Sequence, residues 1–380
     1  MKVWRLARKA AGRAGFCVAL GTAGIGCAQA QSSVTLYGII STGVEYVSNV
    51  KGSHLFALAN GGMMPPRWGL RGDEDIGGGT HAIFTLENGF SITNGASLGG
   101  MFGRQAFVGL SNQRYGTITA GRQYEEMTAS LWWAESANLF AGVGAHIGDN
   151  DNMFFTNRFN NSVRYASPSF AGLTFAGSYA FSNSTQFSNN NGFSGSANYA
   201  NGPLKLGVAF TQFNRRSNAT PSNLTSGAVD STGWGFSSPF VVSPTGAGTD
   251  QQRIIGVGAS YDFGIFNMLA SYTNVLFNYS DSSGLRLQNG EVGVYKRFTP
   301  AWLVGVSYVY TAGDYSGGRS PHYNQVTLAT DYLLSKRTDL FLVGIYQRAS
   351  GPGAFAQIYT TQASSGQSQT LVEAGIRHRF

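Results

Sequence analysis

Charge and long apolar runs are the two features that this 380-residue sequence lacks. Charged residues make up 12% of the chain, about half of their share in an average globular protein. No run of eighteen consecutive apolar residues occurs, which excludes a bundle of membrane-spanning helices. The aromatic content of 13% excludes an intrinsically disordered chain. Glycine is abundant instead, with 52 residues, and its combination with many tyrosines and phenylalanines favours an all-β protein of the membrane-barrel type.

Cysteine is confined to the start of the chain, where Cys17 and Cys27 are the only two. This part begins with five basic residues in thirteen positions and continues with a small, apolar run that ends at Ala28-Gln29-Ala30. A charged start, an apolar middle and an A-x-A site are typical of a cleaved secretory signal peptide. We therefore expect residues 1–30 to be removed, and residues 31–380 to form the mature domain without disulfides or thiol chemistry.

The basic character of the chain resides mostly in this leader. Residues 31–380 keep 21 basic and 19 acidic residues, a balance that gives no reason to expect nucleic-acid binding. An alternative for the leader is lipid attachment at Cys27, but Gly24 stands where a leucine would be expected.

After residue 31, segments of about ten residues alternate between large apolar side chains and small or polar ones. Residues 173–182, 204–211 and 254–263 show this pattern. It predicts the strands of a transmembrane β-barrel, with one face in lipid and the other in a polar lumen. A soluble β-sandwich also alternates, but its inward faces carry bulky side chains. The second face here is mostly glycine, alanine, serine and threonine, which favours the barrel.

Short turns give an independent count of the strands. Glycine, proline, aspartate and serine cluster in seven segments, at 73–80, 112–116, 167–172, 200–203, 262–264, 299–301 and 335–338. Longer polar connections lie between them; examples are 49–63, 125–157, 183–191, 215–250, 314–321 and 349–367. If both ends of the chain lie on the same side of the barrel, the number of tight turns is one less than the number of hairpins. Seven turns therefore predict an antiparallel barrel of 16 strands around an aqueous channel.

Four stretches of the sequence are characteristic in combination. They are Ser33-Val-Thr-Leu-Tyr-Gly-Ile-Ile; Arg67-Trp-Gly-Leu-Arg-Gly-Asp-Glu-Asp-Ile-Gly-Gly-Gly with Phe84-Thr-Leu-Glu-Asn-Gly-Phe; Phe102-Gly-Arg-Gln-Ala-Phe-Val-Gly-Leu with Gly121-Arg-Gln-Tyr; and Gly375-Ile-Arg-His-Arg-Phe. In these stretches the chain resembles the trimeric general porins of Gram-negative bacteria, of the β-proteobacterial type. The resemblance covers essentially the whole mature chain. It implies a passive outer-membrane channel for ions and small hydrophilic solutes, with no reaction and no cofactor.

The resemblance also implies partners and a constricting loop. In porins of this kind three barrels associate in the outer membrane, in contact with lipid and lipopolysaccharide. The third extracellular loop folds into the channel, and residues 125–157 have the length and position of that loop. The closing strand, which ends on Phe380, corresponds to the signal that the outer-membrane assembly machinery recognises.

Arginines on the barrel wall are the candidates for a charge filter, because a pore selects by its width and by the field at its narrowest point. A charge that faced lipid at mid-membrane would cost about 2–4 kcal/mol. With Trp68 and Leu70 toward lipid, alternation therefore directs Arg67 and Arg71 into the lumen.

The same argument applies after the constricting loop. With Phe159, Val163 and Tyr165 toward lipid, alternation directs Arg158 and Arg164 into the lumen.

Alternation leaves Arg104 open, because it shares a face with the apolar residues of its strand. The resemblance implies that Arg104 joins Arg67 and Arg158 in a basic cluster on the wall. Arg122 shares its face with Ile118, so we expect it to point outward and to be a candidate for the subunit interface.

Opposite the arginines we expect carboxylates. The candidates are Glu125, Glu126, Glu135, Asp149 and Asp151 on the loop, and Glu87 on a wall strand. The loop centre, residues 139–148, reads LFAGVGAHIG and lacks the Pro-Glu-Phe-Gly-Gly of the best-known porins. The constriction is therefore expected to be more basic than in cation-selective relatives, which favours anions. We also expect a short helix within residues 125–140, with Trp132 and Trp133 in packing positions.

The sequence gives little support to other sites. Asp149-Asn-Asp-Asn152 has the oxygen ligands of half a calcium loop but lacks its glycine and its distant glutamate, so a solvated turn is favoured. The five histidines show no metal-ligand spacing, and no G-x-S-x-G segment occurs, so neither a metal site nor a catalytic residue is expected.

Three alternatives remain beside the general porin. A substrate-selective porin would need a ladder of aromatic or basic residues along the lumen, and only Tyr37 is a candidate for its start. An outer-membrane barrel enzyme would need catalytic groups at the rim, and a barrel adhesin would bind through its loops.

Overall fold

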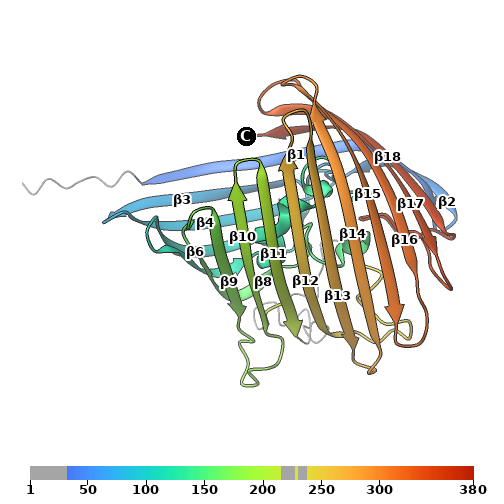
Figure 1. The fold of residues 1–380 in the computed structure, drawn as a ribbon, viewed down its shortest axis with the longest axis horizontal. Coiled ribbons are helices and arrows are strands. Elements are labelled where there is room, and N and C mark those ends of the chain that lie inside the picture. Colours follow the sequence, from blue (N-terminus) through green and yellow to red (C-terminus); the bar gives the residue numbers. More distant parts are fainter. Residues whose placement is uncertain (1–31, 215–226, 230–237) are drawn as a thin grey trace, which may run out of the picture.

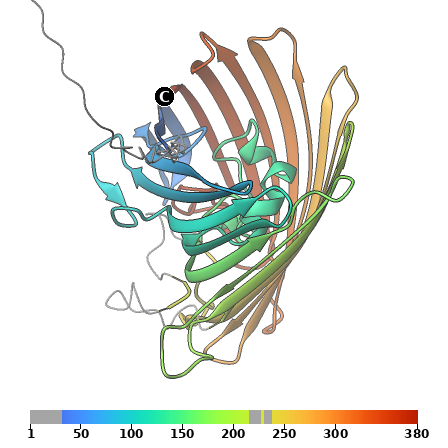
Figure 2. The same cartoon turned by 90° about the vertical axis from the view of Figure 1, so that its left-hand side faces the viewer.

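The chain folds into a single antiparallel sheet that closes on itself (Figures 1 and 2). The computed structural model describes residues 32–214, 227–229 and 238–380. The expected signal peptide and part of the expected connection at 215–250 lie outside the described residues.

Within the described residues the sheet consists of 18 strand segments. They are β1 (Ser33–Val50), β2 (Ser53–Ala59), β3 (Arg67–Gly77), β4 (Thr80–Phe90), β5 (Ser97–Leu98), β6 (Gln105–Asn112), β7 (Gly116–Gln123), β8 (Phe159–Ala166), β9 (Leu173–Ala180), β10 (Gly192–Asn201), β11 (Leu204–Asn214), β12 (Thr249–Asp262), β13 (Asn267–Tyr279), β14 (Gly284–Arg297), β15 (Trp302–Tyr315), β16 (His322–Leu333), β17 (Thr338–Ser350) and β18 (Ser368–Arg379).

Two barrel strands are interrupted, which reconciles 18 segments with the predicted number. β2 and β3 both pair with β1, and β5 and β6 both pair with β4, so each couple forms one strand of the wall. β1 closes the barrel against β18, from Ile39 opposite Arg379 to Val47 opposite Leu371. The expectation of a 16-stranded antiparallel barrel is confirmed.

Side chains alternate between the two faces of the wall. In β15, Val306, Tyr308 and Tyr310 are 47%, 45% and 41% exposed, whereas Ser307 and Thr311 between and after them are 2% and 1% exposed. The exposed set is apolar or aromatic, and the covered set combines the small polar Ser307 and Thr311 with Val309, which is 3% exposed. This is the arrangement of a wall between lipid and a polar lumen.

All seven expected turn segments contain a connection between neighbouring strands at one end of the barrel, but the first is shorter than expected, because β3 continues to Gly77 and only residues 78 and 79 lie between it and β4. At the other end one expectation is wrong. Residues 49–63 are not a continuous loop, because β2 takes up Ser53–Ala59 and the chain reverses at Lys51 and Gly52. These two residues have φ angles of 52° and 100°, as a two-residue hairpin turn with positive φ requires.

The connection between β7 and β8, which we call loop L3 (residues 124–158), lies inside the barrel (Figure 2). It contains α1 (Glu126–Leu131) and the 3₁₀ turns η1 (Trp132–Ala134), η2 (Ser136–Asn138) and η3 (Ile147–Asp149). The expected short helix is thus present. No helix in the described ranges has the length and apolar character needed to cross a membrane.

Small residues on the wall make room for L3. A methyl group at Gly256 or Gly258 of β12 would fall 2.5 Å from Met127 or 2.4 Å from Ala134. Met127 and Ala134 are fully buried in this contact. The glycines that alternate along the lumen face therefore serve as the docking surface for the loop.

One wall residue differs from its expected direction. Phe159 does not face lipid; it is fully buried and packs edge-on against Phe213, with ring centroids 5.3 Å apart. The β7–β8 pairing shifts register between Gly121 and Gln123, and Asn161 has a φ of 50°. This irregularity breaks the alternation, so Val163 and Tyr165 face outward as expected whereas Phe159 does not.

Candidate channel constriction

Arg104 and Glu87 form a buried ion pair at the base of L3. Arg104 Nε lies 2.6 Å from Glu87 Oε1, and Tyr37 donates a hydrogen bond of 2.9 Å to Glu87 Oε2. Arg104 precedes β6, so it is not bound by that strand's alternation and turns inward. Both side chains are nearly inaccessible, at 1% and 4% exposed.

Tyr124 joins Arg104 to Arg158. Its hydroxyl accepts hydrogen bonds from Nη2 of Arg104 at 2.6 Å and from Nη2 of Arg158 at 3.2 Å. The two guanidinium carbons lie 5.9 Å and 4.9 Å from the centre of its ring. Phe155 adds a second ring 5.7 Å from the Arg104 guanidinium. Aromatic faces attract cations, so these rings hold the two arginines in place.

Arg67 and Arg71 complete the basic side of the wall. Together with Glu87, Arg104 and Tyr124 they line one opening of about 460 Å³. Arg71 is exposed and lies 4.1 Å from the centre of the Tyr37 ring. Within the described chain, three arginines and one carboxylate thus line this opening.

Arg164 lies apart from this group. Its Nε and Nη2 bind both carboxylate oxygens of Glu126 at 2.7 Å and 3.1 Å. Glu126 is fully buried at the start of α1 and also accepts from Ser130 at 2.7 Å. This ion pair ties the helix of L3 to the wall.

The acids of L3 are buried rather than presented to the opening, which differs from the expectation. Glu125 is the N-cap of α1 and accepts hydrogen bonds from the backbone of Met127 and Thr128, at 2.7 Å and 3.0 Å, and from the side chains of Asn152 and Thr211. The other four acids of L3 are also buried, with exposures of 0–2%: Glu126, Glu135, Asp149 and Asp151.

His146 connects these acids to the wall. Its Nδ1 lies 2.7 Å from Asp151, and its Nε2 lies 3.2 Å from Glu291 of β14. Glu291 also accepts from the backbone N–H of Ser136 at 3.1 Å, and Asp151 accepts from Thr273 at 2.6 Å. The centre of L3 is therefore held by a buried network of charged and polar groups.

Burial and charge shift the titration of this network. Burial lowers the pKa of His146, but the charge of Asp151 and hydrogen bonds to Asp151 and Glu291 outweigh it and hold the pKa well above 6.5. Burial, followed by the charge of Asp151, raises the pKa of Asp149 to about 6. A protonated imidazole between carboxylates thus fastens the loop.

Sequence reasoning missed Tyr124, His146 and Glu291. Glu291 lies on the lumen face of β14, and alternation along that strand would have found it. Tyr124 and His146 belong to L3, where no period relates position in sequence to direction in space.

Two further predicted residues lie outside the opening. Arg122 is half-buried and donates from Nε to the carbonyl of Gly103 at 2.7 Å and from Nη1 to Asn160. Phe380 pairs with β1 through two backbone hydrogen bonds to Gly38, of 3.0 Å and 3.1 Å. Among the residues that the structure describes, no group of three or more His, Cys, Asp or Glu side chains is arranged to hold a metal ion.

Comparisons with known proteins agree with this architecture. Residues 17–352 match the family model described as Gram-negative porin. An outer membrane porin protein of Bordetella pertussis is 32% identical over 93% of this chain and 96% of its own length. Outer membrane porin protein 32 of Delftia acidovorans is 31% identical over the same shares.

Solved structures resemble the fold as well. The structure described as an anion-selective porin from Comamonas acidovorans superposes with a TM-score of 0.71 at 26% identity, and the match covers 92% of this chain and 100% of the other. The outer membrane protein OmpT of Vibrio cholerae in its trimer form superposes with a TM-score of 0.66 at 13% identity over 92% of this chain and 99% of its own, a likeness of fold alone. The chain belongs to the Gram-negative porin family and is a general porin of the outer membrane, a non-enzymatic channel for ions and small hydrophilic solutes.

Proposed function

We propose that this porin prefers anions and that Arg67, Arg104 and Arg158 set the preference, with Arg71 beside them. The observation that carries the proposal is the charge balance of the opening at the base of L3. Arg67, Arg71, Arg104 and Glu87 line it, and Arg158 is joined to Arg104 through the Tyr124 hydroxyl, while the acids of the loop are buried. A passing anion therefore meets an excess of positive charge at this opening.

The comparison with the anion-selective porin from Comamonas acidovorans supports the same preference.

The test is the zero-current potential of the refolded mature protein, residues 31–380, in a planar bilayer under a tenfold KCl gradient. We expect the potential to report preference for chloride. Each of Arg67→Ala, Arg104→Ala and Arg158→Ala should move it toward the cation limit. Arg114→Ala is the matched control, because Arg114 is exposed in the tight turn between β6 and β7. A potential that reports cation preference in the wild type, or one unmoved by the three variants, would refute the proposal.

We also propose that three copies associate, with Arg122 near the contact. Its backbone belongs to β7, where Ile118 faces outward at 49% exposure. Its bond to Gly103 joins β7 to the loop at residues 91–104. Unboiled gels should show a heat-modifiable trimer, and Arg122→Ala should lower the temperature at which it dissociates. A monomer at all temperatures would contradict this proposal.

Residues 1–30 are proposed to be a cleaved signal peptide, with export followed by delivery to the outer-membrane assembly machinery. N-terminal sequencing of protein from outer membranes should begin at Gln31. A chain that starts at Met1 in the membrane would contradict the cleavage.

A further inference from the structure

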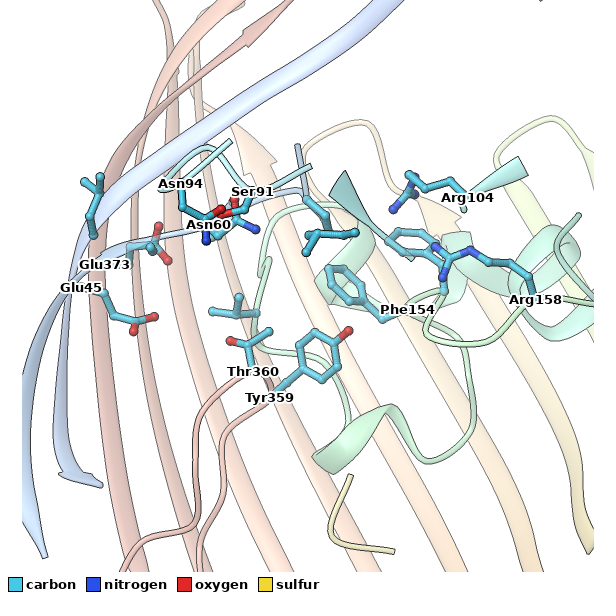
Figure 3. Close-up of a pocket in the computed structure, with 18 residues that line it drawn as sticks. Glu45, Asn60, Ser91, Asn94, Arg104, Phe154, Arg158, Tyr359, Thr360 and Glu373 are labelled. Atoms are coloured by element: carbon cyan, nitrogen blue, oxygen red, sulfur yellow. The ribbon is translucent and has the colours of Figure 1, made fainter. Parts of the chain in front are cut away.

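Arg104 borders two spaces inside the barrel, and these differ in charge. The first, of about 360 Å³, lies toward the long loops and also has Arg158 at its wall (Figure 3). Its far end carries two acids, Glu45 and Glu373 (Figure 3). The second is the basic opening of about 460 Å³, where Glu87 is the one acid among the described lining residues. The first space is thus balanced in charge, and the second has an excess of positive charge.

Loop L3 covers the other side of the basic opening with side chains that carry no charge. Its lining residues in the described chain are Tyr124, Thr128, Ala129, Trp132 and Phe155. The carboxylates expected opposite the arginines are buried elsewhere in L3. Three of the five lining residues are aromatic, so the basic wall is faced by aromatic rings rather than by acids.

Trp132 is the exposed member of the tryptophan pair in L3. Trp133 packs against the wall: its Nε1 donates to the carbonyl of Ser130 at 2.8 Å, and a methyl group at Gly207 of β11 would fall 2.9 Å from its ring. Trp132 is 44% exposed, so the expectation that both rings are in packing positions is wrong for Trp132. It lines the basic opening and also a neighbouring space of about 530 Å³ beside the tight turns. A large apolar ring is thus presented to solutes in the lumen, although its exposure to water is unfavourable.

Arg71 is the cation of the opening that is best placed to bind a ligand. It is exposed, and among the described residues no acid forms an ion pair with it. Glu87, the acid of the opening, is bound to Arg104 and Tyr37 instead. The guanidinium carbon of Arg71 lies 4.1 Å from the centre of the Tyr37 ring, a contact that holds it in place. A guanidinium has five N–H donors, so contact with one ring leaves donors for a carboxylate.

We propose that this opening binds small aromatic carboxylates on their way through the channel, with the carboxylate on Arg71 and the aromatic ring on Trp132. The inference rests on the proposed anion preference and names the class of anion that gains most from it. Arg67 and Arg104 add attraction for the carboxylate, and the ligand ring covers the exposed face of Trp132. Both contacts belong to one opening, whose volume of about 460 Å³ lies within the range of small-molecule sites. A carboxylate joined to its ring by a short flexible chain can make the two contacts together.

Three probes of similar size separate the two contacts. They are 3-phenylpropanoate; 3-cyclohexylpropanoate, which keeps the carboxylate but has no aromatic face; and 3-phenylpropanol, which keeps the ring but has no charge. Each is titrated against the single-channel current of the refolded mature protein in KCl at neutral pH. We expect 3-phenylpropanoate to reduce the current at concentrations about fivefold lower than 3-cyclohexylpropanoate, the order of one aromatic pair. Against 3-phenylpropanol the difference should be about tenfold, the order of one charge-assisted hydrogen bond.

Variants then assign each contact to its residue. Trp132→Phe should keep the preference for 3-phenylpropanoate over 3-cyclohexylpropanoate, whereas Trp132→Leu should abolish it, because leucine fills space without an aromatic face. Arg71→Gln should weaken the effect of both carboxylates about tenfold and leave that of 3-phenylpropanol unchanged. Trp302→Ala is the control for loss of an exposed tryptophan, because Trp302 is 43% exposed on the outer face of β15. It should change none of the three effects.

Two results would overturn the site: equal effects of 3-phenylpropanoate and 3-cyclohexylpropanoate on the wild type, or a preference between them that Trp132→Leu retains. Conductance in KCl and the heat-modifiable band establish that each variant is folded and open. A wild-type channel whose zero-current potential reports cation preference would refute the anion preference itself. A channel that prefers chloride but does not distinguish the two carboxylates would remove the aromatic site alone.

Discussion

The ring of Phe140 in L3 lies against the Cα atom of Gly305 in β15, so closely that a methyl group there would fall 2.4 Å from a ring carbon. Phe140 is 1% exposed and also packs on Tyr295, with centroids 5.6 Å apart. The tip of the loop is thus held by shape as well as by charge.

Gly305→Ala is therefore expected to push L3 away from β15. Overpacking of this kind costs about 1–3 kcal/mol, and the loop is the part that can give way. We expect more frequent current fluctuations in planar bilayers, with the trimer intact on unboiled gels. Gly317→Ala is the control, because nothing lies within 4 Å of a methyl group at that position. Phe140→Leu in the Gly305→Ala background should reduce the fluctuations, and its failure to do so would show that this contact does not hold the loop.

Attachment of L3 should weaken as the pH rises. The pKa of His146 is well above 6.5 and that of Asp149 is raised to about 6. A group with a raised pKa stabilises the attached loop fully below its unfolded pKa, and this stabilisation is lost as the pH passes the raised value. The contribution of Asp149 to loop attachment is therefore lost between about pH 4 and 6. The contribution of His146 is lost above about pH 6.5.

Current noise measured from pH 5 to pH 10 tests this dependence. In the wild type it should increase toward alkaline pH. His146→Gln should be noisier at every pH, because Asp151 and Glu291 then lack their cation, and it should lose the alkaline increase. An alkaline increase that persists in His146→Gln would assign the effect to another group.

Arg164 and Arg158 should differ in what they control, although alternation predicts the same direction for both. Arg164 is bound to Glu126 and is predicted to fasten α1, so Arg164→Gln should increase current fluctuations and change the zero-current potential little. Arg158→Gln should shift the zero-current potential and change the current fluctuations little. If Arg164→Gln shifts the potential as much as Arg158→Gln, the pore field extends to α1.

Phe380 and the pairing of β1 with β18, which closes the barrel, can be tested together. A methyl group at Gly38 would fall 2.3 Å from the ring of Phe380. Gly38→Ala and Phe380→Ala should both lower the yield of heat-modifiable trimer in outer membranes. If the terminal ring acts only by filling space, Phe380→Leu restores the yield; if recognition by the assembly machinery needs the aromatic ring, it does not.

The sequence by itself determined the barrel. Lumen-facing positions are mostly small or polar and lipid-facing positions mostly apolar, so the pattern has a period of two residues, and tight turns add a second signal. Resemblance supplied the inward direction of Arg104, which alternation left open. Alternation along β14 would also have predicted that Glu291 faces the lumen.

Only the tertiary structure decided what L3 and the ends of the strands do. Inside a barrel the loop has no repeating direction, so Glu125, Glu135, Asp149 and Asp151 proved to be buried anchors, and His146 the counter-ion of Asp151. The register shift at Asn161 turned Phe159 inward. Glu45 and Glu373 lie more than three hundred residues apart and meet only because β1 pairs with β18. Contacts of this kind depend on closure of the sheet, and no local pattern in the chain encodes them.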